Sequence, residues 1–201
     1  MSEPIDSVGS GGPIEAQLAR AERKISDLKR ILEVTRLLNS TLNLELQLNM
    51  IQDVATELTG TEVASIFLRD TKTDELFFLS ATGDAAENLK RIPVPVHGSI
   101  AGWVVKNGEP TTVNDVQGDE RHYERTDDET QFVTRSLMAV PLRARDRIIG
   151  ALEVLNKIDN EPFEEEDIDL LETLAAQAAV AIEKARLFEQ SDLISEVVHE
   201  L

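Results

Sequence analysis

The chain has 201 residues, 41% of them hydrophobic, which is enough to bury the core of one ordinary domain with additional helices. Its 38 acidic and 20 basic residues give a formal net charge of −18, which would repel nucleic acids and anionic membrane surfaces. Because the chain contains no cysteine, disulfides, thiol nucleophiles and cysteine-ligated metals are excluded, and a cytoplasmic location is expected.

The first 13 residues are rich in serine and glycine and have no hydrophobic periodicity. This composition predicts a disordered lead at 1–13. The segment is acidic, so it lacks the basic and apolar regions of a signal peptide. Elsewhere no apolar run approaches the roughly 18 residues needed to span a bilayer, so we expect a soluble protein without a membrane partner.

From residue 14 to 42, mostly apolar residues recur in steps of three and four. This heptad stripe consists of Ile14, Leu18, Ala21, Ile25, Leu28, Leu32, Thr35, Asn39 and Leu42. The spacing predicts a coiled-coil helix at 14–42, and about four heptads favour pairing with a second copy as a parallel homodimer. In that dimer, Asn39 would be a buried polar residue that fixes the register. The alternative is that the stripe packs on the chain's own domain.

A second helix and a pair of strands follow. Asn43 is a suitable N-cap for a helix over Leu44–Leu58, and Gly60 is a suitable residue to end it. The runs Val63–Leu68 and Glu75–Ala81 flank a polar turn and have the composition of strands, so they predict a hairpin.

The middle of the chain alternates short extended and helical segments. Ile92–Val96 contains two prolines, which restrict it to an edge strand or extended chain. The pattern then predicts a short helix over Ser99–Lys106 and a strand over Thr111–Val113. Asp115–Arg135 is polar and weakly periodic, and a connection of this length in a compact domain is often a lid.

Two strong strands and a long helix complete the domain. Ser136–Leu142 and Arg147–Leu155 have the pattern of central strands, and the helix over Glu164–Leu201 begins with an acidic turn that suits the positive end of its dipole. The order of elements predicts an α+β fold with one antiparallel sheet of about five or six strands and helices packed on it.

The end of the final helix carries a histidine on a polar face. At about 100° per residue, the opposite face collects the apolar residues Leu193, Ile194, Val197, Val198 and Leu201. His199 is followed by Glu200 and is predicted to face solvent as a nucleophile or acceptor. The alternative is a solvated helix face that happens to contain a histidine.

Four successive segments resemble the signature segments of the GAF domain family. They are 101–104 (AGWV), 113–116 (VNDV), 135–142 (RSLMAVPL) and 149–157 (IGALEVLNK). The resemblance runs over residues 37–187 and implies a GAF sensory domain, flanked on both sides by signalling helices of coiled-coil type. Different GAF domains bind cyclic nucleotides, bilins, haem or small metabolites, so the resemblance does not identify a ligand.

The tail, residues 188–201, is similar to the start of the phosphoacceptor helix of bacterial sensor histidine kinases. The matching stretch is SDLISEVVHEL at 191–201, with Val198 where that family often has serine. The resemblance implies that His199 accepts phosphate, with Glu200 as the adjacent base, in a dimeric four-helix bundle. It also implies a response regulator as partner, and ATP with magnesium only in a separate kinase domain. We therefore expect no enzyme activity from the chain itself.

Seven side chains lie on the segments that would wall the cavity of this fold. They are Trp103, Asn114, Asp115, Tyr123, Phe132, Thr134 and Ser136. Their mixture of aromatic and hydrogen-bonding groups suits a small, partly polar ligand, although Trp103 and Phe132 suit the hydrophobic core equally well. His97 and His122 lack a second ligand at helical or turn spacing, so we interpret them as surface histidines and expect no metal site.

A further pattern concerns cyclic nucleotides. GAF domains that bind them carry Asn-Lys, then Phe, then Asp-Glu; here Asn156, Lys157, Phe163 and Asp167 match, and Ile168 replaces the last residue. We interpret Lys157 and Asp167 as a salt bridge between the sheet and the final helix, and we do not favour a cyclic nucleotide as the ligand.

These features predict a cytoplasmic signal-input domain of a two-component sensor histidine kinase, without a cofactor of its own. A small molecule or a conformational signal would alter the paired helices and so the presentation of His199. Two alternatives stay open. One is a ligand-free GAF scaffold used for dimerisation, and the other is the input domain of a cyclase, phosphodiesterase or phosphatase in which His199 has no role.

Overall fold

The computed structural model describes residues 12–82, 89 and 92–199. Most of the predicted disordered lead, residues 1–11, lies outside this range. Gly12 and Pro13, which were expected to belong to that lead, instead open the first helix.

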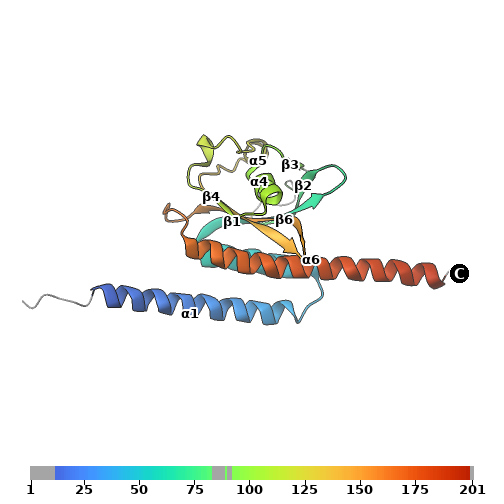
Figure 1. Cartoon of the computed structure of the whole chain (residues 1–201), viewed down its shortest axis with the longest axis horizontal. Coiled ribbons are helices and arrows are strands. Elements are labelled where there is room, and N and C mark those ends of the chain that lie inside the picture. Colours follow the sequence, from blue (N-terminus) through green and yellow to red (C-terminus); the bar gives the residue numbers. More distant parts are fainter. Residues whose placement is uncertain (1–11, 83–88, 90–91, 200–201) are drawn as a thin grey trace, which may run out of the picture.

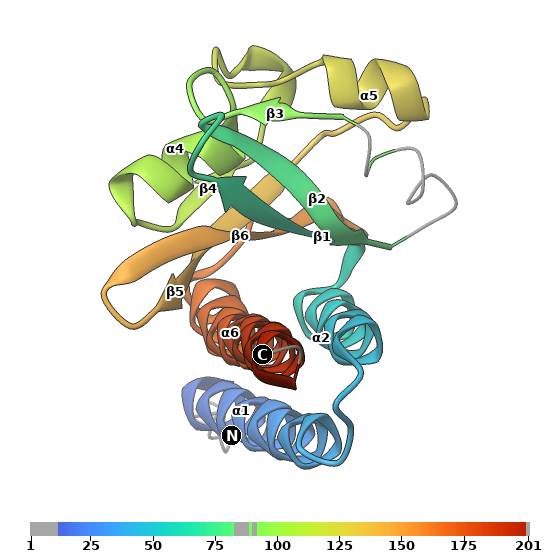
Figure 2. The ribbon, with the colours of Figure 1, turned by 90° about the vertical axis from the view of Figure 1, so that its right-hand side faces the viewer.

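Helices lie on both faces of a single sheet. The described helices are α1 (Gly12–Leu38), α2 (Leu44–Thr59), α4 (Ile100–Asn107), α5 (Arg125–Thr130) and α6 (Glu165–His199), with a 3₁₀ turn at Val116–Gly118. Figure 2 shows α4 and α5 above the sheet, α2 and α6 below it, and α1 beneath those two helices. None of the helices in the described ranges is both long and apolar enough to cross a membrane.

The sheet is antiparallel throughout. Within the described residues its strands are β1 (Thr61–Asp70), β2 (Glu75–Ala81), β3 (Val94–Pro95), β4 (Thr111–Val113), β5 (Leu137–Ala144) and β6 (Arg147–Lys157). They lie in the order β3-β2-β1-β6-β5-β4. The predicted α+β fold with five or six antiparallel strands and packed helices is therefore confirmed.

Local signals set the boundaries of the helices on either side of the sheet. Asn43 Oδ1 accepts a hydrogen bond from Leu46 N at 3.0 Å, and Gly60 adopts a left-handed φ of 60°, so α2 begins and ends within a residue of the predicted positions. In the same way, Ser99 caps the start of α4 and Gly108 ends it in the left-handed conformation.

Two hydrophobic cores lie on opposite faces of the sheet. Along β6, Leu152 and Val154 enter the lower core, which joins the sheet to α2 and α6. Ala151 enters the upper core, which joins the sheet to α4. This alternation is the period of two expected for a strand that is covered on both faces.

Helix α1 packs on the domain through a face that differs from the heptad stripe. Ile31, Val34 and Leu38 are buried in the lower core, whereas Ile25 and Leu32 of the stripe are 53% and 59% exposed. The alternative that the stripe packs on the chain's own domain is therefore wrong. Pairing of the stripe with a second copy stays a prediction.

The stripe is also shorter than predicted, because α1 ends at Leu38. Ser40 Oγ donates a hydrogen bond to Leu37 O at 2.7 Å, a local side-chain bond that competes with continuation of the helix. Asn39 and Leu42 consequently lie in the exposed connection to α2. The register role predicted for Asn39 is wrong, since that residue is not part of a helical seam.

Candidate functional site

A cavity of 310 Å³ lies between the upper face of the sheet and the connection from β4 to β5. We call this connection, residues 115–135, the lid. The sheet contributes Val63, Ser65, Phe67, Phe78, Leu137, Glu153 and Leu155 to the cavity wall. The lid contributes Arg121, His122, Tyr123, Thr126, Asp127, Thr130, Gln131, Phe132 and Thr134. The volume is at the small end of the roughly 300–1,000 Å³ that is usual for ligand pockets, so the cavity suits a small molecule.

Helix α4 forms a side wall of the cavity. Gly102 lies so close to Val96 that a Cβ atom would overlap the Val96 carbonyl, so only glycine permits this approach. The close contact places Ile100 and Ala101, in the first turn of α4, against the cavity.

Glu153 is the least expected residue of the cavity floor. It lies on the upper face of β6 and is 6% exposed. Among the described residues no side chain or backbone group forms a hydrogen bond or ion pair with its carboxyl. Burial raises the pKa of Glu153 to about 8, so the carboxyl is mostly protonated at neutral pH.

Sequence reasoning missed Glu153 although a signal was present. A single glutamate interrupts the apolar run Ile148–Leu155 at a position that the strand period assigns to a covered face. A charged residue at such a position is rare unless it is paired or functional.

The lid holds a polar cluster above this carboxyl. Asp127 accepts hydrogen bonds from Thr134 N at 2.9 Å and Thr134 Oγ1 at 2.7 Å, and its Oδ2 lies 3.4 Å from His122 Nε2. Both ring nitrogens of His122 are buried without a hydrogen bond to the part of the protein that the structure describes. The interpretation of His122 as a surface histidine is therefore wrong, because the fold of the lid turns its ring inward.

Arg121 is the other basic residue of the described cavity wall. Its guanidinium donates to Asp119 at 2.9 Å and 2.7 Å, and these hydrogen bonds lower the pKa of the Asp119 carboxyl. The guanidinium also stacks over the ring of Trp103, 5.2 Å from its centroid. The positive charge of Arg121 is therefore already paired before any ligand enters.

The seven ligand residues predicted from the sequence divide into two groups. Tyr123, Phe132 and Thr134 line the cavity. Four do not line it, namely Trp103, Asn114, Asp115 and Ser136. Trp103 packs beneath Arg121 at the edge of the upper core, and Asn114 and Asp115 are exposed.

The other histidine considered as a metal ligand is His97. His97 is exposed, as expected for a surface histidine. In the described ranges, no group of three histidine, cysteine, aspartate or glutamate side chains is placed to hold a metal ion.

The lid is fastened to the sheet by Asn156. This residue is fully buried at φ 58°, and its Oδ1 accepts hydrogen bonds from Arg135 N at 2.7 Å and Ser136 N at 3.2 Å. Its Nδ2 donates to Val133 O at 2.9 Å and to Glu62 Oε2 at 3.0 Å. One side chain therefore satisfies three backbone groups at the end of the lid.

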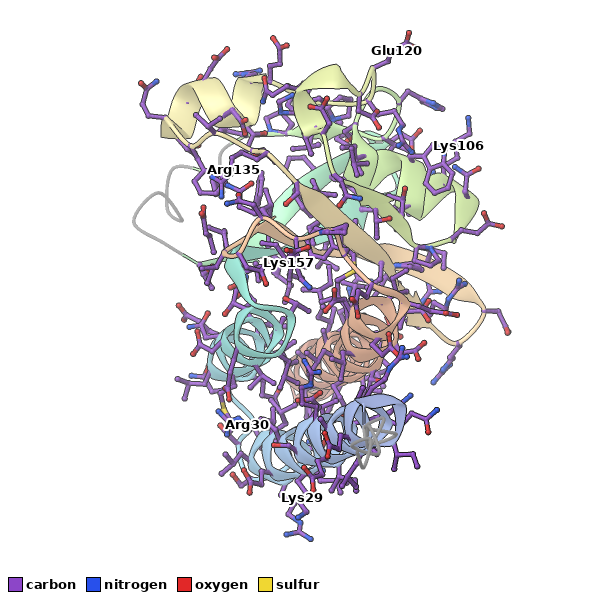
Figure 3. The ribbon with its side chains drawn as sticks, turned by 90° about the vertical axis from the view of Figure 1, so that its left-hand side faces the viewer. Lys29, Arg30, Lys106, Glu120, Arg135 and Lys157 are labelled. Carbon is purple, nitrogen blue, oxygen red and sulfur yellow. The ribbon has the colours of Figure 1, made fainter. Side chains whose placement is uncertain are left out.

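The next residue, Lys157, connects the same strand end to α6. Lys157 Nζ lies 2.8 Å from Asp167 Oδ2, and both side chains are nearly buried, so the ion pair expected from the sequence is present. Asp167 Oδ2 also accepts from Glu164 N at 2.8 Å, at the start of α6. Figure 3 shows Arg135 at the end of the lid and Lys157 between the sheet and the helices.

Phe163 and Asn114 complete this junction. Lys157 Nζ lies 5.8 Å from the centroid of the Phe163 ring, and Phe163 N donates to Asn114 Oδ1 at 3.4 Å. Ser136 Oγ accepts from Lys157 N at 3.2 Å. Asn114 and Ser136 thus contribute to the junction of lid, sheet and α6 rather than to the cavity wall.

The predicted phosphoacceptor lies at the limit of the structure. His199 is the last residue of α6, and its side chain, like those of the apolar face around it, is outside the described part of the chain. Glu200 also lies outside the described residues. The structure therefore places the backbone of His199 on a helix and leaves its predicted chemistry as a prediction.

The chain matches a family model and is similar both to known proteins and to solved structures. The sequence model of the GAF domain matches residues 43–182. A probable 3',5'-cyclic phosphodiesterase, pde-5, from Caenorhabditis elegans is 27% identical over 190 residues, which are 90% of this chain and 26% of the relative. The dual 3',5'-cyclic-AMP and -GMP phosphodiesterase 11A of Takifugu rubripes is 29% identical over 194 residues, which are 87% of this chain and 22% of the relative.

The chain thus spans about a quarter of the length of these two relatives. Among solved structures, the GAF domain of a phosphoenolpyruvate-protein phosphotransferase from Coxiella burnetii superposes with a TM-score of 0.75 at 20% identity. The match covers 83% of this chain and 98% of that domain. The likeness at this level of identity concerns the fold alone.

Proposed function

This chain belongs to the GAF domain family, and we propose that it is the sensory input of a cytoplasmic sensor histidine kinase. As a regulatory GAF domain, it would convert a signal into a change of helix packing. In our proposal a small molecule binds beneath the lid, and the change reaches His199 through α6.

The observation that carries the proposal is the continuous contact from cavity to output helix. Within the lid, Asp127 in the cavity wall binds Thr134, and the neighbouring residues Arg135 and Ser136 bind Asn156. The residue after Asn156 is Lys157, which pairs with Asp167 on α6. A ligand that orders or displaces the lid therefore acts on the first turns of α6 through short polar contacts.

The arrangement of α1 and α6 suits a dimer in which a signal passes along paired helices. In Figure 1, α1 and α6 run in the same direction beneath the sheet, and α6 extends well past the edge of the domain. The exposed stripe on α1 and the exposed Val180, Leu187 and Phe188 on α6 favour a parallel homodimer. Paired helices can change their relative packing when the domains above them change shape.

The histidine kinase assignment depends on the resemblance of residues 191–201 to a phosphoacceptor helix. In that assignment a ring nitrogen of His199 attacks the γ-phosphorus of ATP held by a separate kinase domain, the bond from that phosphorus to the bridging oxygen breaks and ADP leaves, and Glu200 accepts the ring proton. The phosphate then passes to a response regulator. The chain contributes the input and the phosphoacceptor, whereas ATP and magnesium belong to the kinase domain.

The decisive experiment uses a protein that extends past Leu201 into its kinase domain. Wild type and His199→Gln receive labelled ATP, and acid-labile, base-stable phosphate is measured. We expect the label to be lost in His199→Gln while the dimer and fold are retained, and to form more slowly in Glu200→Gln. Equal base-stable labelling of wild type and His199→Gln would exclude His199 as the acceptor.

A second candidate function is the regulatory domain of a cyclic nucleotide phosphodiesterase or another signalling enzyme. The two curated relatives favour it, because both are phosphodiesterases and align over most of this chain. A dimerising scaffold without ligand is a third reading, which the cavity and its buried polar groups do not favour. Phosphodiesterase activity in the extended protein, without labelling of His199, would support the second candidate.

A further inference from the structure

The cavity floor holds the carboxyl of Glu153, which forms no hydrogen bond or ion pair with another described group. Glu153 shares its side of the sheet with Ser65 on β1 and Ala139 on β5, its register partners. Neither neighbour carries a charge. Of the described groups, none donates a hydrogen bond to this carboxyl. Burying an unpaired polar group costs free energy, and a ligand that pairs with the carboxyl would remove that cost.

Among the described residues around the cavity, no cationic side chain is free of an acidic neighbour. Besides Glu153, the titratable and charged side chains of the described wall are Arg121, His122, Tyr123 and Asp127. Arg121 is neutralised by Asp119, and among the described residues the imidazole of His122 lies beside Asp127. The backbone dipole at the start of α4 adds only a partial positive charge at Ile100 and Ala101. The described wall therefore offers an anion no free cationic side chain, whereas a bound cation can pair with the carboxylate form of Glu153.

The remainder of the wall is apolar and partly aromatic. Phe67 and Phe78 form a tilted pair with ring centroids 4.3 Å apart, and both line the cavity beside Leu137 and Leu155. Such a surface gains free energy by covering a flat or apolar body. The polar head of a ligand would lie toward Glu153 and His122, and its apolar body would lie over the phenylalanines.

We propose that Glu153 is a specificity-determining residue that selects a small ligand with a positively charged nitrogen group, such as an amine, amidine or guanidine, on an apolar or aromatic body. The proposal rests on the sensory function of the cavity and names the class of molecule that the cavity takes. His122 supplies a second polar contact through one of its unpartnered ring nitrogens.

Binding of a cation beside Glu153 should release a proton. Because burial raises the pKa of Glu153 to about 8, the empty cavity holds a neutral carboxyl at pH 7. A bound cation favours the carboxylate and lowers that pKa, so binding releases about one proton at pH 7. Affinity should consequently rise up to about tenfold per pH unit below pH 8 and then level off.

The test uses three probes of one shape and different charge: benzamidine, benzamide and benzoate. Their affinities for the 201-residue chain are measured by calorimetry at pH 6, 7 and 8, with proton release obtained from buffers of different ionisation enthalpy. The variants are Glu153→Gln and a matched control, Glu120→Gln, which changes an exposed lid glutamate that points away from the cavity (Figure 3). Amide exchange of the lid reports whether each probe binds in the cavity.

We expect benzamidine to bind most tightly and to release a proton. Glu153→Gln should lose about thirtyfold in benzamidine affinity and lose most of the pH dependence, with benzamide less affected. Glu120→Gln should behave as wild type. The pH series on wild type keeps the test valid if Glu153→Gln folds poorly.

Three outcomes would overturn the proposal. Benzoate or benzamide binding as tightly as benzamidine, with the lid protected, would exclude charge selection and leave the sensory cavity intact. An unchanged pH dependence in Glu153→Gln would assign the proton to another group and so exclude Glu153 as the selecting residue. Failure of all three probes to bind would exclude the proposed ligand class, whereas labelling of His199 would still decide the kinase assignment separately.

Discussion

Two buried carboxyls, those of Asp167 and Glu153, lie in different surroundings. Asp167 is paired with Lys157 and accepts a backbone hydrogen bond in a nearly buried position. Glu153 has no such partner within the described chain, so burial raises its pKa and it becomes neutral instead. The first carboxyl fixes structure, and the second is available to a ligand.

The Lys157–Asp167 pair should matter far more than a surface pair. Lys157→Met leaves the Asp167 charge in a position that is only 11% exposed, so we expect a loss of about 2–3 kcal/mol in the free energy of unfolding. Urea denaturation measures this loss. The matched control is Glu129→Gln, which removes an exposed pair with Arg125 and should cost less than about 0.5 kcal/mol. Equal effects would contradict the structural role of the buried pair.

Stability without ligand should depend on Glu153 between about pH 5 and pH 8. The folded pKa of about 8 exceeds the unfolded value, so the folded state binds more protons in this window. The contribution of Glu153 to stability is therefore largest below the unfolded pKa and falls by about 1.4 kcal/mol per pH unit as the pH rises toward 8. The difference between wild type and Glu153→Gln in urea isolates this slope. A constant difference across the window would contradict it.

The lid and α1 are held to the domain differently from the strands of the sheet. The lid contains only short helical segments and is held at its C-terminal end by Asn156. Helix α1 touches the lower core through one face and is tied at its surface by ion pairs, such as Arg30 with Glu57 on α2 at 2.9 Å. Figure 3 shows Arg30 beside α2 and Lys29 on the outer side of α1.

Removing the Asn156 amide should loosen the lid without unfolding the domain. Asn156→Gly keeps the positive φ without strain but removes four hydrogen bonds, so the amides of Arg135 and Ser136 should exchange with solvent at least tenfold faster. The control Asn160→Gly changes an exposed asparagine with φ 57° and should leave lid exchange unchanged. Hydrogen exchange with mass spectrometry measures both. Equal lid protection in all three proteins would argue against Asn156 as the attachment.

The exposed stripe on α1 should support dimerisation. Changing Ile25 and Leu32 together to Asp places charge in the proposed seam, so the mass by light scattering at tens of micromolar should fall from dimer to monomer. Ala19 and Ser26 changed to Asp are the control, because they have the same spacing and are exposed on another face. A wild type that is monomeric at this concentration would contradict the dimer.

At the scale of the whole molecule, charge limits the ligands that the domain can take. The net charge of −18 repels anions at long range, and the Asp127 carboxyl adds to this repulsion within the cavity. Within the described wall, Arg121 is paired with Asp119 and therefore is not available to a phosphate.

Cyclic AMP and cyclic GMP should therefore bind poorly. At millimolar concentration each should raise the melting temperature by less than about 1 °C, because a ligand stabilises a protein by RT ln(1 + [L]/Kd), which is small when its concentration does not exceed Kd. Thermal unfolding with and without nucleotide measures this, with sodium phosphate at the same ionic strength as the control. A rise of several degrees would contradict the charge argument and favour the phosphodiesterase-type function.

The sequence by itself determined the elements and the fold class. Asn43 and Gly60 bound α2, and the strand Glu75–Ala81 has the predicted limits, because caps, turns and hydrophobic period act over a few residues. The Lys157–Asp167 ion pair was also predictable, because both residues match the Asn-Lys, Phe and Asp pattern of the GAF domains that bind cyclic nucleotides.

Only the tertiary structure decided which side chains meet. The sequence period could not tell which face of α1 its own domain would cover, and the structure buries Ile31 and Val34 and leaves the heptad stripe exposed. Three of the seven predicted ligand residues line the cavity, because the path of the lid depends on contacts such as Asn156 with Arg135 across 21 positions. Glu153 and His122 came together in the cavity for the same reason. Local pattern fixes the direction of a side chain on its own element, and only long-range packing determines what that side chain faces.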